Sequence, residues 1–160
     1  MNVLPIETKR LRLVLQTRED ARRCLAQMQP EDRASVSAAW LALLEGSSLA
    51  DPWIHGFVME HRDTGGAIGR CGFKGPADGN GMVEIAYSVD PEHESQGYAT
   101  EAAEALVGYA FGQHQVRVVW AHTLPQSSAS TRVLIKCGFR HVGEVVDPED
   151  GLVWRWERHK

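Results

Sequence analysis

The segment 81–113 most constrains how this chain can fold, because it passes from a strand through a polar turn into a helix without interruption. Apolar and smaller or polar residues alternate along its first part, which is typical of a strand with one buried face. The apolar positions are Val83, Ile85, Tyr87 and Val89. From Tyr98 the apolar residues recur at the spacing of an amphipathic helix; they are Ala99, Ala102, Ala103, Leu106, Val107, Ala110 and Phe111. The change of period predicts a β-strand followed closely by an α-helix.

The turn between these two elements ends in Gly97, where the helix is predicted to begin. A helix N-terminus has unpaired backbone N–H groups and a partial positive charge, so a loop leading into it can hold a phosphate group. A glycine at this point lets a ligand approach the backbone closely. The same residues also fit an ordinary turn. The local pattern alone therefore leaves anion binding and a simple connection both open.

The rest of the chain alternates between strand-like and helix-like segments without repeats or linkers. Strands are predicted at 8–15, 54–61, 66–74, 81–89, 116–123, 139–146 and 152–158, and helices at 18–29, 31–45, 98–111 and 129–137. This order predicts an α/β fold with a mixed, mostly antiparallel, twisted sheet of about seven strands and helices on both faces. At 160 residues the chain has the size of a single domain, which we expect to span 1–160.

Charge and cysteine usage exclude several classes of partner. The net charge is −4 and no run of Lys or Arg exceeds two residues, so we expect neither nucleic acid nor an anionic membrane as a partner. The cysteines, Cys24, Cys71 and Cys137, have no metal or redox spacing, and the seven histidines have no ligand spacing, so no metal is predicted. The chain has neither a membrane-span pattern nor a signal-peptide pattern, so a cytoplasmic location is expected.

The run from Ser88 to Ala102, SVDPEHESQGYATEA, resembles the acyl-CoA motif of the GNAT N-acetyltransferases and is most similar to the branch that includes RimJ and RimL. In that family the loop reads Arg/Gln-x-x-Gly-x-Gly/Ala, and its backbone amides hold the pyrophosphate of CoA. Gly97 and Ala99 match the last two anchors, whereas Glu94 replaces the basic or amide residue at the first. The chain also opens like the family, with Thr8 and Arg10 before Leu11. The resemblance covers nearly the whole chain and implies a GNAT fold.

A second segment, 124–139, resembles the family pattern in which an Asn and a Ser precede Gly-Phe. Ser127 stands at the Asn position, which holds the pantetheine arm in relatives, and Ser130 at the Ser position, which lies near the sulfur as a proton donor. Both serines also fit a helix-capping role. The end of the strand would offer backbone groups to the pantetheine amides. The predicted CoA-binding residues are Tyr87, Ser88, Val89, Ser95, Gln96, Gly97, Tyr98, Ala99, Thr100, Ser127 and Ser130.

Acyl transfer to an amine needs a base, because a primary amine is mostly protonated at neutral pH. Glu84 is the first candidate, since it lies on the predicted central strand, on the face opposite Val83 and Ile85, where the family branch carries an acidic residue. An ion pair with a neighbouring cation is the alternative role for Glu84. Asp147 and Glu149 are second candidates for the base. The predicted catalytic residues are thus Glu84 and Ser130.

The resemblance implies direct transfer of the acetyl group of acetyl-CoA to a primary amine, either a protein N-terminus or a small molecule. Three alternatives remain: transfer of another acyl group such as succinyl, which would need a cation in the cleft; a non-catalytic acyl-CoA sensor, for which Glu94 and Ser127 are the motivating departures; and a pure interaction module, which would have no need for both CoA-like segments. The helices at 18–29 and 31–45 correspond to the family's acceptor side. Relatives occur as monomers and dimers, so a homodimer remains open.

Overall fold

The sheet of this protein is mixed and mostly antiparallel, as predicted. The structure is a computed structural model that describes residues 5–31, 36, 38–46 and 51–160. Its strands are β1 (Ile6–Glu7), β2 (Leu11–Leu15), β3 (Phe57–His61), β4 (Ala67–Phe73), β5 (Met82–Val89), β6 (Val118–Thr123), β7 (Arg140–Asp147) and β8 (Gly151–His159). They form one eight-stranded sheet in the order β1-β2-β3-β4-β5-β6-β8-β7. The eighth strand is β1, a two-residue segment paired with β2 that the sequence pattern does not separate from its neighbour.

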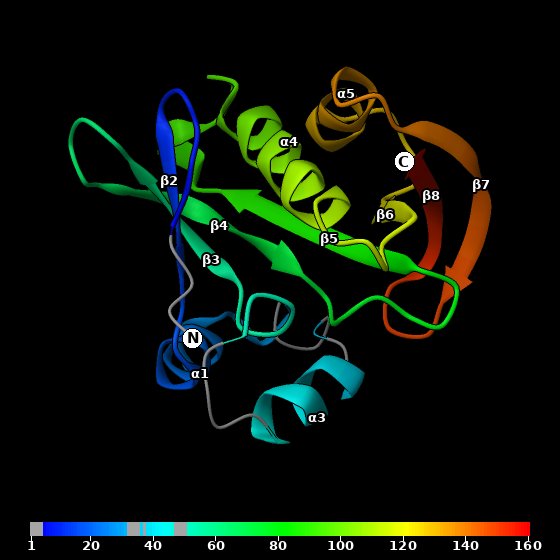
Figure 1. Cartoon of the computed structure of the whole chain (residues 1–160), viewed down its shortest axis with the longest axis horizontal. Coiled ribbons are helices and arrows are strands. Elements are labelled where there is room, and N and C mark those ends of the chain that lie inside the picture. Colours follow the sequence, from blue (N-terminus) through cyan, green and yellow to red (C-terminus); the bar gives the residue numbers. More distant parts are fainter. Residues whose placement is uncertain (1–4, 32–35, 37, 47–50) are drawn as a thin grey trace.

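The described helices lie on both faces of the sheet, which confirms the predicted layers (Figure 1). They are α1 (Arg18–Gln27), α3 (Ala38–Gly46), α4 (Tyr98–Phe111) and α5 (Ala129–Lys136), with a short 3₁₀ helix, η1 (Pro91–His93), before α4. Figure 1 shows α4 and α5 on one side of the sheet and α1 and α3 on the other. The helix predicted at 31–45 is confirmed over α3, while 32–35 and 37 lie outside the described residues.

Helix α4 packs closely on the sheet because its inner face consists largely of small residues. Ala102, Ala103 and Ala110 are fully buried beside Leu106, which is also fully buried. These residues share a core with the facing side chains of the central strands, including Val83 and Ile85 of β5. Burying each large aliphatic side chain of this kind stabilises the fold by about 1.5–3 kcal/mol. The N-terminus of α4 is thereby held rigidly next to the end of β5.

A smaller core joins α1 and α3 on the opposite side of the sheet. Its buried members are Ala21, Leu25 and Leu44. Helix α1 begins at a capping box in which the Thr17 hydroxyl accepts the Asp20 N–H and the Asp20 carboxylate accepts the Thr17 N–H. None of the helices in the described ranges combines the length and the apolar character needed to cross a membrane.

Strands β5 and β6 are the only parallel neighbours in the described sheet, and they pair over only part of their length. Residues Met82 to Glu84 pair with Val118 to Trp120. Beyond these pairs β5 continues to Val89 and β6 to Thr123 without a ladder between them. The edge of β5 that faces β6 is therefore unpaired near its C-terminal end. An extended ligand could pair with that edge as an added strand does.

Candidate functional site

A cavity of about 510 Å³ lies where β5 ends, between the loop into α4 and the first turns of α5. It brings together the two segments that the sequence singles out, although more than twenty residues separate them in the chain. Its lining residues are Tyr87, Ser88, Val89, His93, Glu94, Ser95, Gly97, Tyr98, Ala99, Thr100, Ala129, Ser130, Arg132, Val133 and Lys136. We call this space the donor cavity. Of the predicted CoA-binding residues, only Gln96 and Ser127 are not part of its lining.

The start of α4 is a helix N-terminus that no side chain caps. Gly97 occupies the N-cap position with a φ of 86°, in the left-handed region that favours glycine. Ser95, two residues earlier, also has a positive φ of 62°. Within the described residues, the first-turn amides of α4 therefore have no side-chain partner at the edge of the donor cavity, and the helix dipole adds positive potential there. This geometry suits a phosphate or pyrophosphate group.

Arg10, immediately before β2, holds this loop in place, a role that the sequence does not predict. Its Nη1 donates to the backbone oxygen of Gln96 at 2.9 Å, and its Nε donates to Glu101 Oε1 at 2.9 Å. Its guanidinium carbon lies 4.4 Å from the ring centroid of Tyr98. The hydroxyl of Thr8 also donates to the Glu101 carboxylate. The signal in the sequence is the Thr8 and Arg10 pair of the family's opening segment, whose contacts become visible only in the folded chain.

The Arg10–Glu101 pair is reflected in the pKa of the carboxyl group. Burial raises the pKa of Glu101, but hydrogen bonds from Thr8 and from the backbone and side chain of Arg10 outweigh it, so the pKa lies below its usual value. Glu101 therefore stays ionised and keeps Arg10 beside the loop. Two further cations, Arg132 and Lys136 of α5, line the donor cavity. Together these cations offset the negative charge of Glu94, which also lines it.

The predicted serines have different positions at the start of α5. Ser128 caps the helix, with its hydroxyl accepting the Thr131 N–H at 3.3 Å. Ser130 is exposed and lines the donor cavity, and its backbone oxygen accepts the Tyr87 hydroxyl at 3.1 Å. Burial raises the pKa of Tyr87, so this hydroxyl keeps its proton. Ser127 is exposed and not part of the cavity lining. The geometry thus leaves the Ser130 hydroxyl, but not that of Ser127, at the donor cavity.

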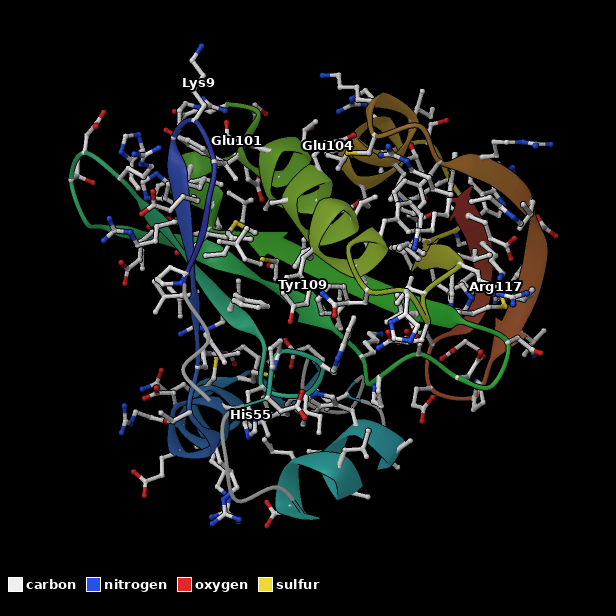
Figure 2. All side chains as sticks on the ribbon, viewed as in Figure 1. Lys9, His55, Glu101, Glu104, Tyr109 and Arg117 are labelled. Carbon is white, nitrogen blue, oxygen red and sulfur yellow. The ribbon has the colours of Figure 1, made fainter. Side chains whose placement is uncertain are left out.

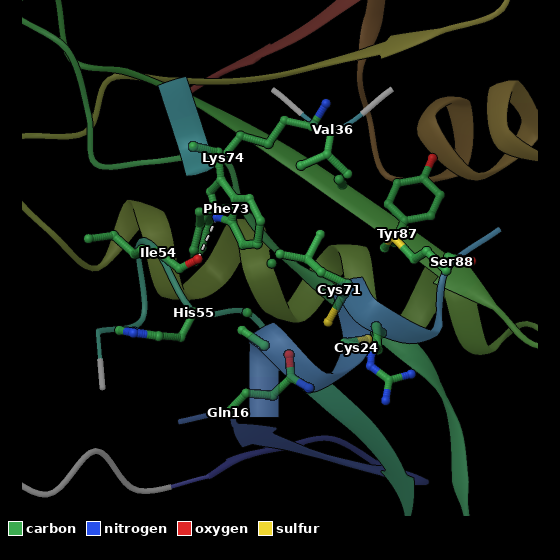
Figure 3. Close-up of a pocket in the computed structure, with 18 residues that line it drawn as sticks. Gln16, Cys24, Val36, Ile54, His55, Cys71, Phe73, Lys74, Tyr87 and Ser88 are labelled. Atoms are coloured by element: carbon green, nitrogen blue, oxygen red, sulfur yellow. Dashed lines mark hydrogen bonds between the residues drawn. The ribbon is translucent and has the colours of Figure 1, made fainter. Parts of the chain in front are cut away.

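A second cavity, of about 310 Å³, lies between α1, α3 and the opposite face of β4 and β5 (Figure 3). We call it the acceptor-side cavity. Most of its lining is apolar, and its polar or charged members include Gln16, Arg70 and Lys74. It shares Tyr87 and Ser88 with the donor cavity. The two spaces therefore meet at the end of β5, one on each side of the sheet.

Glu84 lies earlier on β5 than Tyr87 and Ser88 and lines neither cavity. Its carboxylate forms an ion pair with Lys74 at 3.4 Å, which is the alternative role considered from the sequence, and only 17% of its side chain is exposed. Burial raises the pKa of Glu84 above its usual value despite the opposing effect of Lys74. A raised pKa brings a carboxyl group closer to working pH, as a general base requires. The ion pair and the role as base are compatible.

His122 of β6 belongs to the same polar region. Its Nδ1 lies 3.7 Å from Asp147 Oδ1, and its buried Nε2 has no hydrogen-bond partner in the described structure. Burial lowers the pKa of His122, so the ring is neutral near pH 7. Lys74, Asp147 and Arg155 act electrostatically on both Glu84 and His122.

The second candidates for the base are Asp147, the last residue of β7, and Glu149, in the turn that leads to β8. Asp147 accepts the backbone N–H groups of Glu149 and Asp150, both at 3.0 Å. Burial raises the pKa of Asp147, but these backbone hydrogen bonds, together with the charges of His122 and Lys74, lower it overall. Glu149 is exposed in the turn. Asp147 is therefore held ionised, which suits an electrostatic partner of His122 better than a proton acceptor.

The described residues contain no group of three or more His, Cys, Asp or Glu side chains that could hold a metal ion. A long anionic ligand can bind from the donor cavity, and a small apolar group can bind from the opposite side of the sheet. Ser130 offers a hydroxyl in the donor cavity, and Glu84, the ion-pair partner of the acceptor-side residue Lys74, offers a carboxylate of raised pKa.

Comparison with known proteins identifies a family for this arrangement. Residues 6–140 match the family model described as "Acetyltransferase (GNAT) domain". A Bacillus subtilis relative, the uncharacterized N-acetyltransferase YoaA, is 35% identical over 85 residues, which is 53% of this chain and 48% of the relative. The chain thus spans about half the length of this curated relative.

Two solved structures share the fold over nearly their whole length. A GNAT-family acetyltransferase from Bacillus anthracis superposes with a TM-score of 0.71 at 19% identity, covering 98% of both chains. RimL, a ribosomal L7/L12 alpha-N-protein acetyltransferase solved in complex with coenzyme A, superposes with a TM-score of 0.71 at 15% identity, covering 97% of both chains. At these identities the likeness shows the fold alone.

Proposed function

The chain belongs to the GNAT acetyltransferase family, and from this premise we propose that it transfers the acetyl group of acetyl-CoA directly to a primary amine. The observation that carries the proposal is the junction of the two cavities at Tyr87 and Ser88. Direct transfer requires both substrates at once, and two cavities that border the same residues from opposite faces of the sheet would bring a thioester on one side close to an amine on the other. Bringing the reacting groups together in this way is itself a large part of catalysis.

The donor cavity fits the parts of CoA in order. The uncapped amides at the start of α4 suit the pyrophosphate, with Arg132 and Lys136 adding positive charge. The unpaired edge of β5 near Tyr87, Ser88 and Val89 suits the amides of the pantetheine arm. When bound, acetyl-CoA supplies the thioester whose acetyl group is transferred. Because the contacts to the loop come from backbone amides, Glu94 does not remove them.

The chain's own residues supply the proton transfers. Glu84 accepts the proton of the attacking amine, directly or through water, as its C–N bond forms, and the hydroxyl of Ser130 protonates the leaving thiolate as the C–S bond breaks. The raised pKa of Glu84 and the exposure of Ser130 in the donor cavity support these roles. We further propose kinship with the RimJ/RimL branch and a cytoplasmic location, where the free cysteines stay reduced.

The proposal is tested by two measurements on the full chain. Titration calorimetry with acetyl-CoA should show binding, and release of free thiol should accelerate when a primary amine is added. Absence of binding would overturn the proposal. Binding without thiol release across a broad amine panel would instead favour the non-catalytic sensor, for which Glu94 at the loop is the motivating observation.

A further inference from the structure

The lining of the acceptor-side cavity indicates which amines this site can hold, an inference that deepens the proposed function and rests on it. The cavity volume of about 310 Å³ is at the small end of the ~300–1,000 Å³ typical of small-molecule sites. Its apolar part is formed by side chains such as Leu25, Met28, Trp40, Ile54 and Phe73. No carboxylate is among the described residues that line it. Such a lining disfavours a polycationic acceptor and suits a compact apolar group.

The charged residues at this cavity are arranged along the β4–β5 ladder. Arg70 pairs in register with Ser88, and Gly72 with Ala86. Side chains opposite each other in an antiparallel pair point to the same face of the sheet. Gly72 must stay small, since a Cβ there would lie 2.9 Å from the Cα of Gly56. The cavity therefore reaches close to the backbone at the Gly72–Ala86 pair. Two residues further along the ladder, Arg70 lies opposite Ser88, where the two cavities share lining residues.

Arg70 forms no ion pair within the described residues, although Asp20 and Glu60 line an adjoining cavity that Arg70 also lines. Lys74, the other cation of the ladder, already pairs with Glu84 at 3.4 Å. The side chain of Arg70 has no hydrogen bond or ion pair within the described residues and is exposed. A guanidinium binds a carboxylate in a two-pronged geometry, so an anionic group on the ligand is its natural partner.

The amide of Gln16 is a second polar group at this cavity. Gln16 is only 8% exposed, and its side chain makes no hydrogen bond within the described chain. Figure 3 shows its amide directed toward Cys24 and Cys71, inside the acceptor-side cavity. The amide atoms are not fully buried, so they are open to a hydrogen bond from water or from a ligand amine or carboxylate.

We infer that the acceptor is a free α-amino acid with an apolar side chain, whose carboxylate forms an ion pair with the guanidinium of Arg70. One carbon separates the carboxylate from the amine, so a carboxylate at Arg70 places the amine near Ser88, where the two cavities meet. The apolar side chain then fills the space between α1, α3 and the sheet. A protein N-terminus lacks this carboxylate and would leave Arg70 unpaired.

The test compares acetylation of L-phenylalanine with that of L-phenylalaninamide, which differs only at the carboxylate, with spermidine as a polycation. We expect kcat/KM for the amino acid to exceed that for the amide by roughly tenfold or more, the worth of one charge-assisted pair. The amide has the less basic amine, so intrinsic reactivity works against this expectation. Arg70→Gln should lower kcat/KM for the amino acid and leave the amide unchanged. Arg140→Gln, an exposed arginine outside both cavities, should preserve the preference.

The outcomes separate this inference from the proposed function. Equal or better use of the amide or of spermidine would overturn the inference while leaving amine acetylation intact, and so would acetyl-CoA binding with no turnover of the amino acid. A preference for succinyl-CoA that depends on Arg70 would assign the carboxylate to the acyl group instead, which also overturns it. Failure to bind acetyl-CoA in calorimetry would remove the proposed function itself.

Discussion

The donor cavity and the acceptor-side cavity meet at the same two residues but are built in different ways. The donor cavity is formed from two continuous segments, the end of β5 with the loop into α4 and the start of α5, and the uncapped backbone amides of α4 lie at its edge. The acceptor-side cavity draws single side chains from α1, β4 and β5 and from the segment around Ile54. A site made of backbone amides keeps its ligand when side chains change, because the amides are present in every residue but proline. A site made of side chains can change its ligand through single substitutions. The difference explains how one donor site can serve varied acceptors.

Figure 2 shows where charged and aromatic side chains lie in the molecule as a whole. Charged side chains such as Lys9, Glu104 and Arg117 lie around the outside of the sheet and of α4. Tyr109 points from α4 toward the sheet, whereas His55 lies on the other side, near α3. Tyr109 packs against Trp53, with ring centroids 5.7 Å apart, and Trp53 against Phe73 at 4.7 Å. This aromatic cluster links α4 to the edge of the acceptor-side cavity, which Phe73 lines.

The largest effect is expected on the chemical step, where the two cavities act together. Glu84→Gln should lower kcat by roughly 100-fold, because general base catalysis contributes about 10²–10⁴. In the wild type, kcat/KM should rise with pH through the raised pKa of Glu84, since only the ionised carboxylate accepts a proton. The variant should lose this limb of the pH profile. Steady-state kinetics from pH 5 to about 8 measure both effects.

The control for this variant is Glu19→Gln, an exposed carboxyl group on α1 that lines neither cavity. We expect it to retain wild-type kinetics. A Glu84→Gln enzyme with full kcat and an unchanged pH profile would show that Glu84 serves only as the ion-pair partner of Lys74.

The next largest effect is expected on acetyl-CoA affinity, which tests the donor cavity alone. Gly97→Val should weaken acetyl-CoA binding by roughly tenfold to 100-fold, because a β-branched residue is strained at a φ of 86° and its Cβ would lie 3.2 Å from Arg10 Nη2. Gly108→Ala, within the same helix and with no atom within 4 Å of the added Cβ, should leave the affinity unchanged. Calorimetry with acetyl-CoA measures both. Equal affinities for the two variants would contradict the assignment of the pyrophosphate to the start of α4.

A smaller effect is expected on the free energy of unfolding, through the Arg10–Glu101 pair that holds the loop before α4. Because the pKa of Glu101 is lowered in the folded state, its ionised form stabilises the fold above its ordinary pKa, and this stabilisation is lost as the pH falls through the lowered value. Glu101→Gln should therefore unfold more easily than the wild type at pH 7, by about 1 kcal/mol. The difference should shrink at strongly acidic pH. Urea denaturation at both pH values tests this, and a pH-independent difference would count against the ion pair with Arg10.

The smallest effect concerns the leaving thiolate. Ser130→Ala should lower kcat only a few-fold, because a thiolate is a good leaving group and water can protonate it. Thermal stability should be unchanged, since Ser128, not Ser130, caps α5. A large loss of acetyl-CoA affinity with unchanged kcat would instead make Ser130 a binding residue. Single-turnover measurement of thiol release distinguishes these results.

Local sequence determined much of this protein. The alternation in β5, the glycine at the start of α4 and the capping residues Thr17 and Ser128 act within a few residues of themselves, so the elements and the mixed sheet could be predicted from their spacing. The short pairing of Ile6 and Glu7 with β2 could not, because it depends on a neighbouring strand and not on a local period.

Only the tertiary structure decided how the site is completed. Arg10 reaches Gln96 and Glu101 across more than eighty positions of the chain, and Arg70 stands beside Ser88 because β4 and β5 pair in that register. The buried Nε2 of His122 has no hydrogen-bond partner within the described residues. This too depends on the tertiary structure, because other strands supply the neighbours of the ring. A residue's type and spacing determine its own conformation, whereas its partners, burial and pKa depend on which distant segments fold against it.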